Sequence, residues 1–286
     1  MYSRANLSQR VAPRSQASSA GCLRIGLALA MVAIAVISFL GSKQFNPVTG
    51  EDQYVSISQD QEIAMGLQAA PEMAAEFGGL DPDPDYQAFV DALGNVLVQN
   101  SVAASSGYPF EFYVLADTQT VNAFALPGGP VFVTRALIDA METEGQVAGV
   151  MAHEISHVLA RHSAEQIAQT QLTQGITGAV LIATYDPENP SSQQAAQMAV
   201  LVSQLVNMQF SREDELQADR LGVQIMAEAG YDPRSMADVM ETLAAANPGG
   251  MPEFFSTHPN PDNRIQRIEE AIQALYPNGV PEGLIP

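Results

Sequence analysis

Residues 144–162 read EGQVAGVMAHEISHVLARH, and this stretch decides the fold of the chain. Its apolar residues recur every three or four positions, which predicts one helix from about Glu144 to beyond His162 with an apolar back face. That back face consists of Val147, Val150, Met151, Ile155, Val158 and Leu159. We therefore expect a core helix at the centre of the domain.

Within that helix, residues 153–157 read His-Glu-Ile-Ser-His. Positions four apart share one helix face, so His153 and His157 can aim their imidazoles at one Zn²⁺. Glu154 lies about 100° further round the helix, beside the metal, where its carboxylate can take a proton from a zinc-bound water. The pentapeptide by itself predicts a metal site with a general base.

Such a site needs a third protein ligand and an open position for water. On a continuous helix His162 points away from the other two histidines, so we expect a solvated or capping histidine outside the site. Glu215 and Asp219 are acidic candidates, four apart on one face of a helix predicted to begin at Ser211. Glu215 can bind the metal while Asp219 holds a ligand histidine by its distal N–H. The alternative is an acidic, solvated helix face.

The rest of the chain predicts more helices and one small sheet. Helices are expected at 61–77 (broken or kinked at Pro71), 85–99, 134–141, 211–229, 233–246 and 261–276. Strands are expected at 110–116, 120–125 and 131–134, with a Pro-Gly-Gly-Pro turn before the last. Two apolar stretches, 176–184 and 195–206, are too short to cross a bilayer and are expected to be buried helices. The fold class is therefore α+β, mostly helical, with a small sheet.

The charges are divided unevenly along the chain. Residues 1–43 contain five basic residues and no acid, whereas the rest of the chain holds all 32 acidic residues and no lysine. A body this acidic repels nucleic acid and anionic lipid headgroups, so we expect no nucleic-acid partner. Solubility is the simplest explanation of the charge. Cys22 is the only cysteine, so no internal disulfide is expected.

Residues 25–41, IGLALAMVAIAVISFLG, are uncharged and mostly apolar, and they follow four arginines. This pattern fits a signal peptide or a short signal anchor, and we favour the anchor because no small-x-small site ends the apolar run. The arginines should stay in the cytoplasm while the chain after Lys43 crosses the membrane. The expected organisation is a basic cytoplasmic segment at 1–24, the signal anchor or signal peptide at 25–41, a linker at 42–60, the metal-binding domain at 61–276 and a Pro/Gly-rich tail at 277–286.

The ordered set of motifs resembles the membrane-associated zinc metalloendopeptidases of the HtpX, BepA and Oma type. HEISH is followed by the Glu-x-x-x-Asp helix of Glu215 and Asp219. Further similar segments are NPVTG at 46–50, NAFALPGG at 122–129, SRE…ELQADRLG at 211–222, and STHP…RI at 256–265. The resemblance covers about residues 46–275 and implies a zincin-like metalloprotease domain, with the small sheet beside the HExxH helix.

The resemblance also implies roles for particular residues. It implies one Zn²⁺ per chain, the metal ligands His153, His157 and Glu215, the general base Glu154, and Asp219 as the carboxylate that orients a ligand histidine. His258 matches a family histidine that can approach the metal, either as an oxyanion stabiliser or as a latch on the open position; the alternative is an ordinary loop histidine. Arg264 can anchor that loop, face the catalytic centre or lie on the surface of the last helix.

The segment Asn122, Ala123, Phe124 and Ala125 resembles the substrate-side strand of the family. An extended substrate can pair with an exposed strand edge, which gives binding that tolerates many sequences. The alternative for this segment is an ordinary hairpin.

The function implied by the resemblance is that of an exported zinc metalloendopeptidase acting on misfolded or unassembled envelope proteins. The expected location is the membrane, with the catalytic domain on the periplasmic side; a cleaved, soluble periplasmic form is the alternative. A second functional class is a zinc-bearing chaperone or adaptor that binds unfolded envelope polypeptides with a latched site. Glu154 favours the enzyme, because a protein that only binds needs no positioned base.

Overall fold

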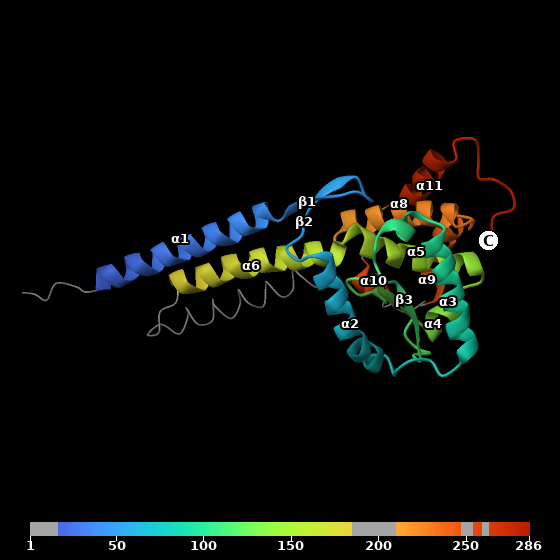
Figure 1. Cartoon of the computed structure of the whole chain (residues 1–286), viewed down its shortest axis with the longest axis horizontal. Helices are drawn as coiled ribbons and strands as arrows, with labels where there is room; N and C mark the ends of the chain where they lie inside the picture. The colour runs from blue at the N-terminus through green and yellow to red at the C-terminus, as the bar shows by residue number, and fades with distance from the viewer. Residues whose placement is uncertain (1–16, 185–209, 247–253, 259–262) are drawn as a thin grey trace, which may run out of the picture.

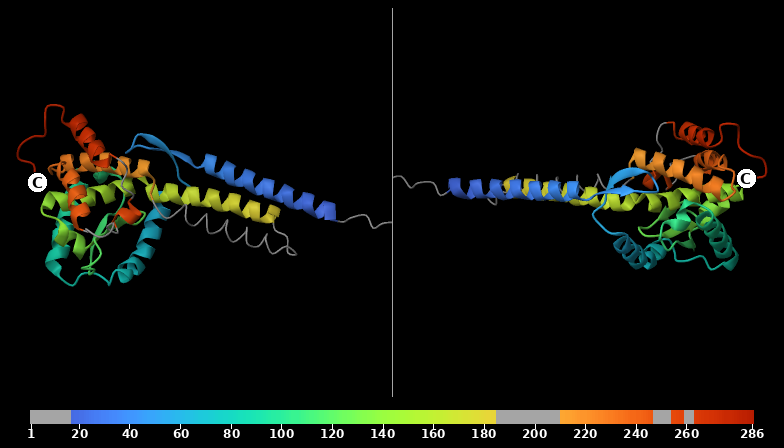
Figure 2. Two further views of the ribbon diagram at one scale, coloured as in Figure 1. Left: turned by 180° about the vertical axis from the view of Figure 1, so that it is seen from behind. Right: turned by 45° about the horizontal axis from the view of Figure 1, so that its top comes forward.

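In the computed structural model of the chain, residues 17–184, 210–246, 254–258 and 263–286 are described. Two long helices, α1 (Ala17–Gly41) and α6 (His162–Thr184), lie side by side and project from a globular part (Figure 1). Two further views show the same projection (Figure 2). We call this pair of helices the arm.

Helix α1 contains the predicted anchor. Within the described ranges, Leu23–Gly41 is the one helical stretch that is long and apolar enough to cross a membrane. Most of its large apolar side chains are exposed: Leu23, Ile25, Leu27, Leu29, Ile34, Ile37 and Leu40. An apolar helix with so little cover has the length and composition of a membrane anchor.

The stretch 42–60, predicted as a linker, contains an antiparallel β-hairpin. Its strands are β1 (Lys43–Asn46) and β2 (Glu51–Tyr54). Two buried amides bind the hairpin to the end of the HExxH helix: Asn46 donates to the Leu159 carbonyl at 2.9 Å, and Gln53 donates to the Ala160 carbonyl at 3.0 Å. Because the last carbonyls of a helix have no partner within it, the hairpin caps that helix.

Two helices follow the hairpin, α2 (Gln59–Glu76) and α3 (Pro84–Gln99). Ser58 begins α2 in a capping box with Gln61, and Asp83 caps α3 immediately before the proline at its first position. Of the two predicted effects of Pro71, a break or a kink, the break is not found, because α2 continues through the proline. A short 3₁₀ helix (Val102–Ser105) precedes the sheet.

A three-stranded sheet forms one wall of the globular part. Its strands are β3 (Glu111–Leu115), β4 (Ala123–Ala125) and β5 (Pro130–Thr134), in the order β3-β5-β4. Strand β3 is parallel to β5 and β4 is antiparallel to it. The turn between β4 and β5 contains Gly128 and Gly129 at φ 83° and 131°, which side chains other than glycine rarely adopt. Strand β4 contacts the HExxH helix, as predicted for the small sheet.

The HExxH helix is α5 (Glu144–Ala160), and it is shorter than predicted. Arg161 adopts a left-handed conformation (φ 60°), which ends α5, and α6 begins at His162. The Arg161 guanidinium donates to the Glu62 carboxylate and, at 2.8 Å, to the Ile57 carbonyl. The prediction of one helix running past His162 is therefore wrong, since a tertiary ion pair holds the chain in a turn that no helix pattern reveals.

The apolar stretch 176–184 forms the end of α6 and is not a buried helix. Ile176 and Val180 are 38% and 47% exposed, and the helix lies against α1 in the arm. The prediction of burial in the domain is wrong for this stretch. The other apolar stretch, 195–206, lies outside the described residues.

The remaining described helices are α4 (Arg135–Ala140), α8 (Arg212–Glu228), α9 (Ser235–Ala246), α10 (Phe254–Thr257) and α11 (Arg264–Leu275). Of these, α8 and α9 pack directly against α5. The core lies between α5, the sheet, α3, α8 and α9, and α5 is buried along almost its whole length. The predicted α+β, mostly helical fold with a small sheet is confirmed.

The predicted tail at 277–286 returns to the domain. Ile285 donates to the Gly230 carbonyl at 3.1 Å and accepts from the Asp232 amide at 2.8 Å. The Pro286 carbonyl accepts from the Gly145 amide at 2.8 Å, at the first turn of α5. The tail thus helps to hold the start of the HExxH helix in place.

Candidate metal centre

The site forms where α5 packs against α8. Gly222 of α8 lies at this contact: a Cβ atom there would lie 3.4 Å from the backbone nitrogen of His153 on α5 and 2.6 Å from Met236 Cε on the neighbouring α9. Ser211 begins α8 in a capping box and thereby sets the register of its first turns. As a result Glu215 and Asp219, one turn apart, both face the HExxH motif.

Four buried side chains direct ligand atoms to one place: His153, His157, Glu215 and His258. Their ligand atoms all lie within 4.8 Å of one another. The Nε2 atoms of His153 and His157 are 3.0 Å apart, and each is 3.4 Å from an oxygen of Glu215. The structure therefore brings together the two histidines of the pentapeptide and the predicted carboxylate.

Asp219 fixes the orientation of the His153 ring. Its Oδ1 lies 2.9 Å from His153 Nδ1, and a carboxylate only accepts, so Nδ1 carries the proton and Nε2 presents a lone pair to the cluster. Arg264 donates to both oxygens of Asp219, at 2.7 and 2.8 Å, and holds the carboxylate in turn. Of the three placements considered for Arg264, the structure shows the one facing the site, buried at 2% exposure.

A second chain of hydrogen bonds fixes the ring of His157. Gln217 donates from Nε2 to Glu51 at 2.9 Å, which leaves its Oε1 to accept from His162 Nε2 at 2.9 Å. His162 Nδ1 is then an acceptor, and it lies 2.9 Å from His157 Nδ1. The proton of His157 therefore sits on Nδ1, and its Nε2 presents a lone pair to the cluster.

The prediction of a solvated or capping role for His162 is wrong. The side chain is buried, and it contacts a histidine of the pentapeptide. The reason is the left-handed turn at Arg161, which invalidates angles counted along one continuous helix. Two other contacts were not foreseen: Gln217 in the chain of hydrogen bonds, and Phe210, whose ring stacks on His157 with centroids 4.2 Å apart.

The donor set fits a divalent metal ion. The Nε2 atoms of His153 and His157 lie 3.0 Å apart, a distance that requires a shared proton or a bound cation between them. Three buried carboxylates, Glu154, Glu215 and Asp219, face a single buried guanidinium, Arg264. The carboxylates thus exceed the guanidinium by two charges, which a divalent cation balances, and imidazole nitrogens with one carboxylate are ordinary ligands for such an ion.

The pKa values follow the same electrostatics. Burial alone would lower the pKa of His153, but hydrogen bonds and charge from Asp219 and Glu215 outweigh it and raise the pKa to about 9. Burial lowers the pKa of His157 well below its usual value. Burial would raise the pKa of Glu215, but hydrogen bonds from three histidines lower it strongly, so this carboxylate stays ionised. The carboxylates therefore favour a positive charge at the centre of the cluster.

Glu154 differs from the other buried acids. Within the described part of the chain neither of its oxygens has a hydrogen-bond partner, although the residue is fully buried. His258 Nε2 lies 3.5 Å from its Oε1. A carboxylate without partners beside a cluster of ligand atoms is free to bind a water molecule and to accept a proton.

His258 reaches the cluster from a third segment of the chain, outside α5 and α8. Its Nδ1 lies 3.1 Å from a Glu215 oxygen and 3.3 Å from His153 Nε2. The Phe254 ring stacks on the imidazole with centroids 4.5 Å apart, and the Phe254 amide donates to the Val121 carbonyl at 3.4 Å. The segment 254–258 therefore connects two places: Phe254 is hydrogen-bonded to Val121, next to the predicted substrate strand, and His258 lies in the ligand cluster.

The predicted substrate strand forms the edge of the sheet. The structure places Ala123, Phe124 and Ala125 in β4, and among the described strands β4 pairs with β5 alone. Asn122 precedes the strand: its amide donates to the Thr134 hydroxyl at 3.1 Å, and its carbonyl accepts from the Thr134 amide at 3.0 Å. Its own Oδ1 has no partner within the described residues. Phe124 stacks on Phe132 of β5, with centroids 5.0 Å apart. Strand β4 also contacts α5, so the predicted substrate strand lies beside the HExxH helix.

Comparison with known proteins agrees with this geometry. The model of peptidase family M48 matches residues 84–272. The chain belongs to peptidase family M48. The matched stretch of the M48 domain contains the HExxH helix, α8 and most of α11, so it includes the whole ligand cluster.

Curated relatives of the M48 domain come from bacteria and from mitochondria. A β-barrel assembly-enhancing protease of Yersinia pestis is 34% identical over 251 residues, which cover 84% of this chain and 49% of that protein. The protein of that name from Escherichia coli is 30% identical over 252 residues, covering 84% of this chain and 50% of its own. The mitochondrial metalloendopeptidase OMA1 of Schizosaccharomyces pombe is 32% identical, covering 84% and 70%. The chain spans about half the length of the two bacterial relatives.

Proposed function

We propose that the M48 domain of this chain is a zinc-dependent metalloendopeptidase. The observation that supports it most is the position of Glu154, a buried carboxylate without hydrogen-bond partners in the described residues, beside the converging lone pairs of His153 and His157. A binding site alone has no use for a buried, unpaired base, because burying it costs free energy. The relatives named as proteases point to the same chemistry.

In this proposal His153, His157 and Glu215 hold one Zn²⁺, since two imidazoles and a carboxylate form a usual ligand set for catalytic zinc. When bound, the ion supplies Lewis-acid chemistry: it polarises a carbonyl group and lowers the pKa of water toward about 7. Asp219 and Arg264 keep the His153 ring oriented, and His162 with Gln217 does the same for His157.

The chain's own catalytic step belongs to Glu154. Its carboxylate takes a proton from the attacking water, and the hydroxyl oxygen bonds to the carbon of the scissile amide. When the carbon–nitrogen bond breaks, Glu154 returns the proton to the leaving nitrogen, so the products are a carboxylic acid and an amine. His258 can donate a hydrogen bond to the oxyanion if the segment 254–258 moves with the substrate.

The proposed substrates are misfolded or unassembled envelope polypeptides. An extended chain can add a strand to the outer edge of β4, at Asn122–Ala125, and such pairing selects unfolded over folded proteins. The proposed location is the periplasmic side of a membrane, with α1 as the anchor, because the arginines before its apolar stretch favour the cytoplasmic side. A name that refers to β-barrel assembly in two relatives is compatible with envelope substrates.

The decisive test is Glu154→Gln, which keeps the shape of the side chain but removes the base. We expect cleavage of an unfolded, fluorescently labelled casein to fall by about 10²–10⁴-fold while zinc content stays at one ion per chain. Glu213→Gln, an exposed change on α8, is the matched control and should leave both quantities unchanged. Full turnover by Glu154→Gln would falsify the assigned mechanism.

A second function, a latched chaperone or adaptor, is favoured by one observation. His258 completes a set of four protein ligands, and a tetrahedral zinc site with four protein ligands has no open position for water. If this is the resting state, His258→Ala should raise casein cleavage, because it frees the fourth position. A fall in cleavage would instead assign His258 to the oxyanion, and the latch would be rejected.

A further inference from the structure

The arm joins two helices whose contact lies outside the globular part. In both figures α1 and α6 run alongside each other away from the domain (Figures 1 and 2). A Cβ atom built on Gly175 would lie 2.6 Å from the Ala35 Cβ, and one built on Gly178 would lie 3.4 Å from Met31 Cε. Later residues of α6 therefore contact earlier residues of α1, so the two helices are antiparallel.

This register places the end of α6 beside the apolar stretch of α1. Gly175 lies level with Ala35, and α6 continues for more than two further turns to Thr184. Those turns accompany α1 through about half of Leu23–Gly41, the stretch that is long and apolar enough to span a membrane. If α1 lies in a bilayer, the end of α6 lies at the same depth.

The surface of α6 changes character along its axis. No charged residue occurs between Gln166 and Thr184. The exposed residues nearer the domain are Gln169, Gln171 and Gln174, whereas those further away are Ile176, Val180 and Ala183. A helix lying on a protein surface is polar and apolar on opposite faces, whereas this one is polar at one end and apolar at the other. Such a gradient is expected of a helix that enters an apolar phase lengthwise.

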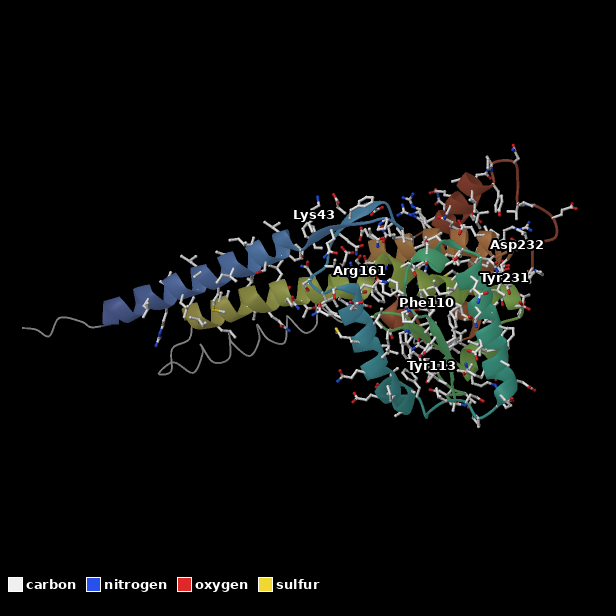
Figure 3. All side chains as sticks on the ribbon, viewed as in Figure 1. Lys43, Phe110, Tyr113, Arg161, Tyr231 and Asp232 are labelled. Atoms are coloured by element: carbon white, nitrogen blue, oxygen red, sulfur yellow. The ribbon has the colours of Figure 1, made fainter. Side chains whose placement is uncertain are left out.

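Aromatic side chains lie where the arm meets the domain. Phe39 of α1 stacks on Tyr54 of the hairpin, with ring centroids 4.6 Å apart, and Phe45 is 64% exposed beside them on β1. Lys43 follows the apolar stretch directly, and Figure 3 shows it at the base of the arm. Aromatic rings next to a basic residue are typical of the level of the lipid headgroups.

We propose that α6 is a second membrane-embedded helix, with Gly175–Thr184 in the hydrocarbon of the bilayer beside α1. The proposal rests on the proposed attachment of the chain through α1. Lipid is the occupant that matches both helices, since it covers the exposed apolar side chains of α1 and α6 at one depth. Close contact at glycines is the usual way that helices pack in lipid, and the backbone hydrogen bonds of α6 are satisfied within the helix.

The embedded helix is continuous with the metal centre. Helix α6 begins at His162, whose Nδ1 accepts from His157. Thirteen residues separate His162 from Gly175, which is about 20 Å of helix. The catalytic centre would thus be held about 20 Å from the hydrocarbon, within reach of polypeptide segments that emerge from the membrane or lie on it.

Lipid quenching of a site-specific fluorophore tests the proposal on the full chain. In a Cys22→Ser background, single cysteines replace Val180 on the outer part of α6, Ile34 on α1, Gln169 on the inner part of α6, and Gln266 on α11. Each is labelled with bimane and reconstituted into phosphatidylcholine vesicles that contain lipids with nitroxide on their acyl chains. Zinc content and the circular dichroism spectrum confirm that every variant is folded.

We expect the loss of fluorescence for Val180→Cys to equal that for Ile34→Cys and to exceed by several-fold the loss for Gln169→Cys and Gln266→Cys. Quenching for Ile34→Cys without quenching for Val180→Cys would overturn the embedding of α6 and leave the α1 anchor intact. If the fluorophore on Ile34→Cys is itself not quenched, the proposed attachment through α1 fails, and the embedding of α6 fails with it.

Discussion

Two buried groups of charges lie along α5, one at the HExxH motif and one at the end of the helix, and they differ in their balance of charge. The group at the end of α5 contains one acid, Glu62, and one base, Arg161. Arg161 donates to Glu62 Oε1, and Tyr108 donates to Glu62 Oε2 at 3.0 Å. At the metal centre, three carboxylates share the single guanidinium of Arg264. The charges of the first group balance each other, whereas the second group has two more carboxylates than guanidinium groups, an excess that a bound cation balances.

This difference separates structure from function more clearly than burial does. Both groups contain fully buried acids, but only the second contains a carboxylate, Glu154, whose oxygens have no partner in the described residues. Figure 3 shows Arg161 where the arm joins the domain, at the left-handed turn between α5 and α6. We therefore expect changes at the first group to affect folding and changes at the second to affect metal binding.

The largest expected effect is on stability, from Arg161→Met. It leaves the buried Glu62 carboxylate without its charged partner, which should cost about 3–5 kcal/mol of unfolding free energy. Urea unfolding measures this quantity. The double variant Glu62→Leu with Arg161→Met should recover much of the loss, because it removes both charges. Equal instability in the single and double variants would show that the pair itself is not the cause.

Glu215→Gln should have the next largest effect, on metal affinity. The substitution removes one negative charge and a carboxylate oxygen from the cluster. Mutation of residues that only hydrogen-bond to metal ligands lowers metal affinity by about 10–100-fold, so loss of a ligand should lower zinc affinity by about 100-fold or more. Competition with a zinc chelator gives the affinity. Glu213→Gln, an exposed change two residues earlier on α8, is the control and should bind zinc normally. Unchanged affinity in Glu215→Gln would remove it from the proposed ligand set.

The smallest expected effect comes from Gln217→Leu, which acts through His162. Without the amide oxygen, His162 can place its proton on Nδ1 and no longer accepts from His157, whose Nε2 lone pair is then lost part of the time. Zinc affinity should fall by about tenfold, measured by the same competition. Gln224→Leu, two turns further along the same helix, should have no effect. Equal affinities in the two variants would show that the hydrogen-bond chain does not position His157.

Much of the candidate site could be predicted from local spacing. The i, i+4 relation within HEISH and between Glu215 and Asp219 survives in any helix, because helix geometry fixes which residues share a face. The resemblance to a known family paired the two helices and added His258 and Arg264. The sheet and its turn followed from alternating apolar residues and from a Pro-Gly-Gly-Pro segment.

What the sequence could not show depends on contacts between distant segments. His162 was expected outside the site because nothing in the local pattern reveals the left-handed turn at Arg161, which a carboxylate 99 residues earlier holds in place. The hairpin at 43–54 was expected to be a linker because its residues are polar. Two of these polar side chains bond to the end of α5, more than 100 residues later, and local sequence cannot show such a contact. The apolar end of α6 was expected in the core for a similar reason: its partner is α1.

Local spacing and composition were enough to predict the helical faces, the small sheet, the acidic body and the apolar N-terminal stretch, since each depends on residues a few positions apart. The tertiary structure decided how these parts combine. It set three carboxylates against one guanidinium at the metal centre, turned His162 towards His157, and placed α6 against α1. The physical reason is that charge balance, proton position and helix pairing are properties of groups in space, and their partners lie tens of residues apart in the chain.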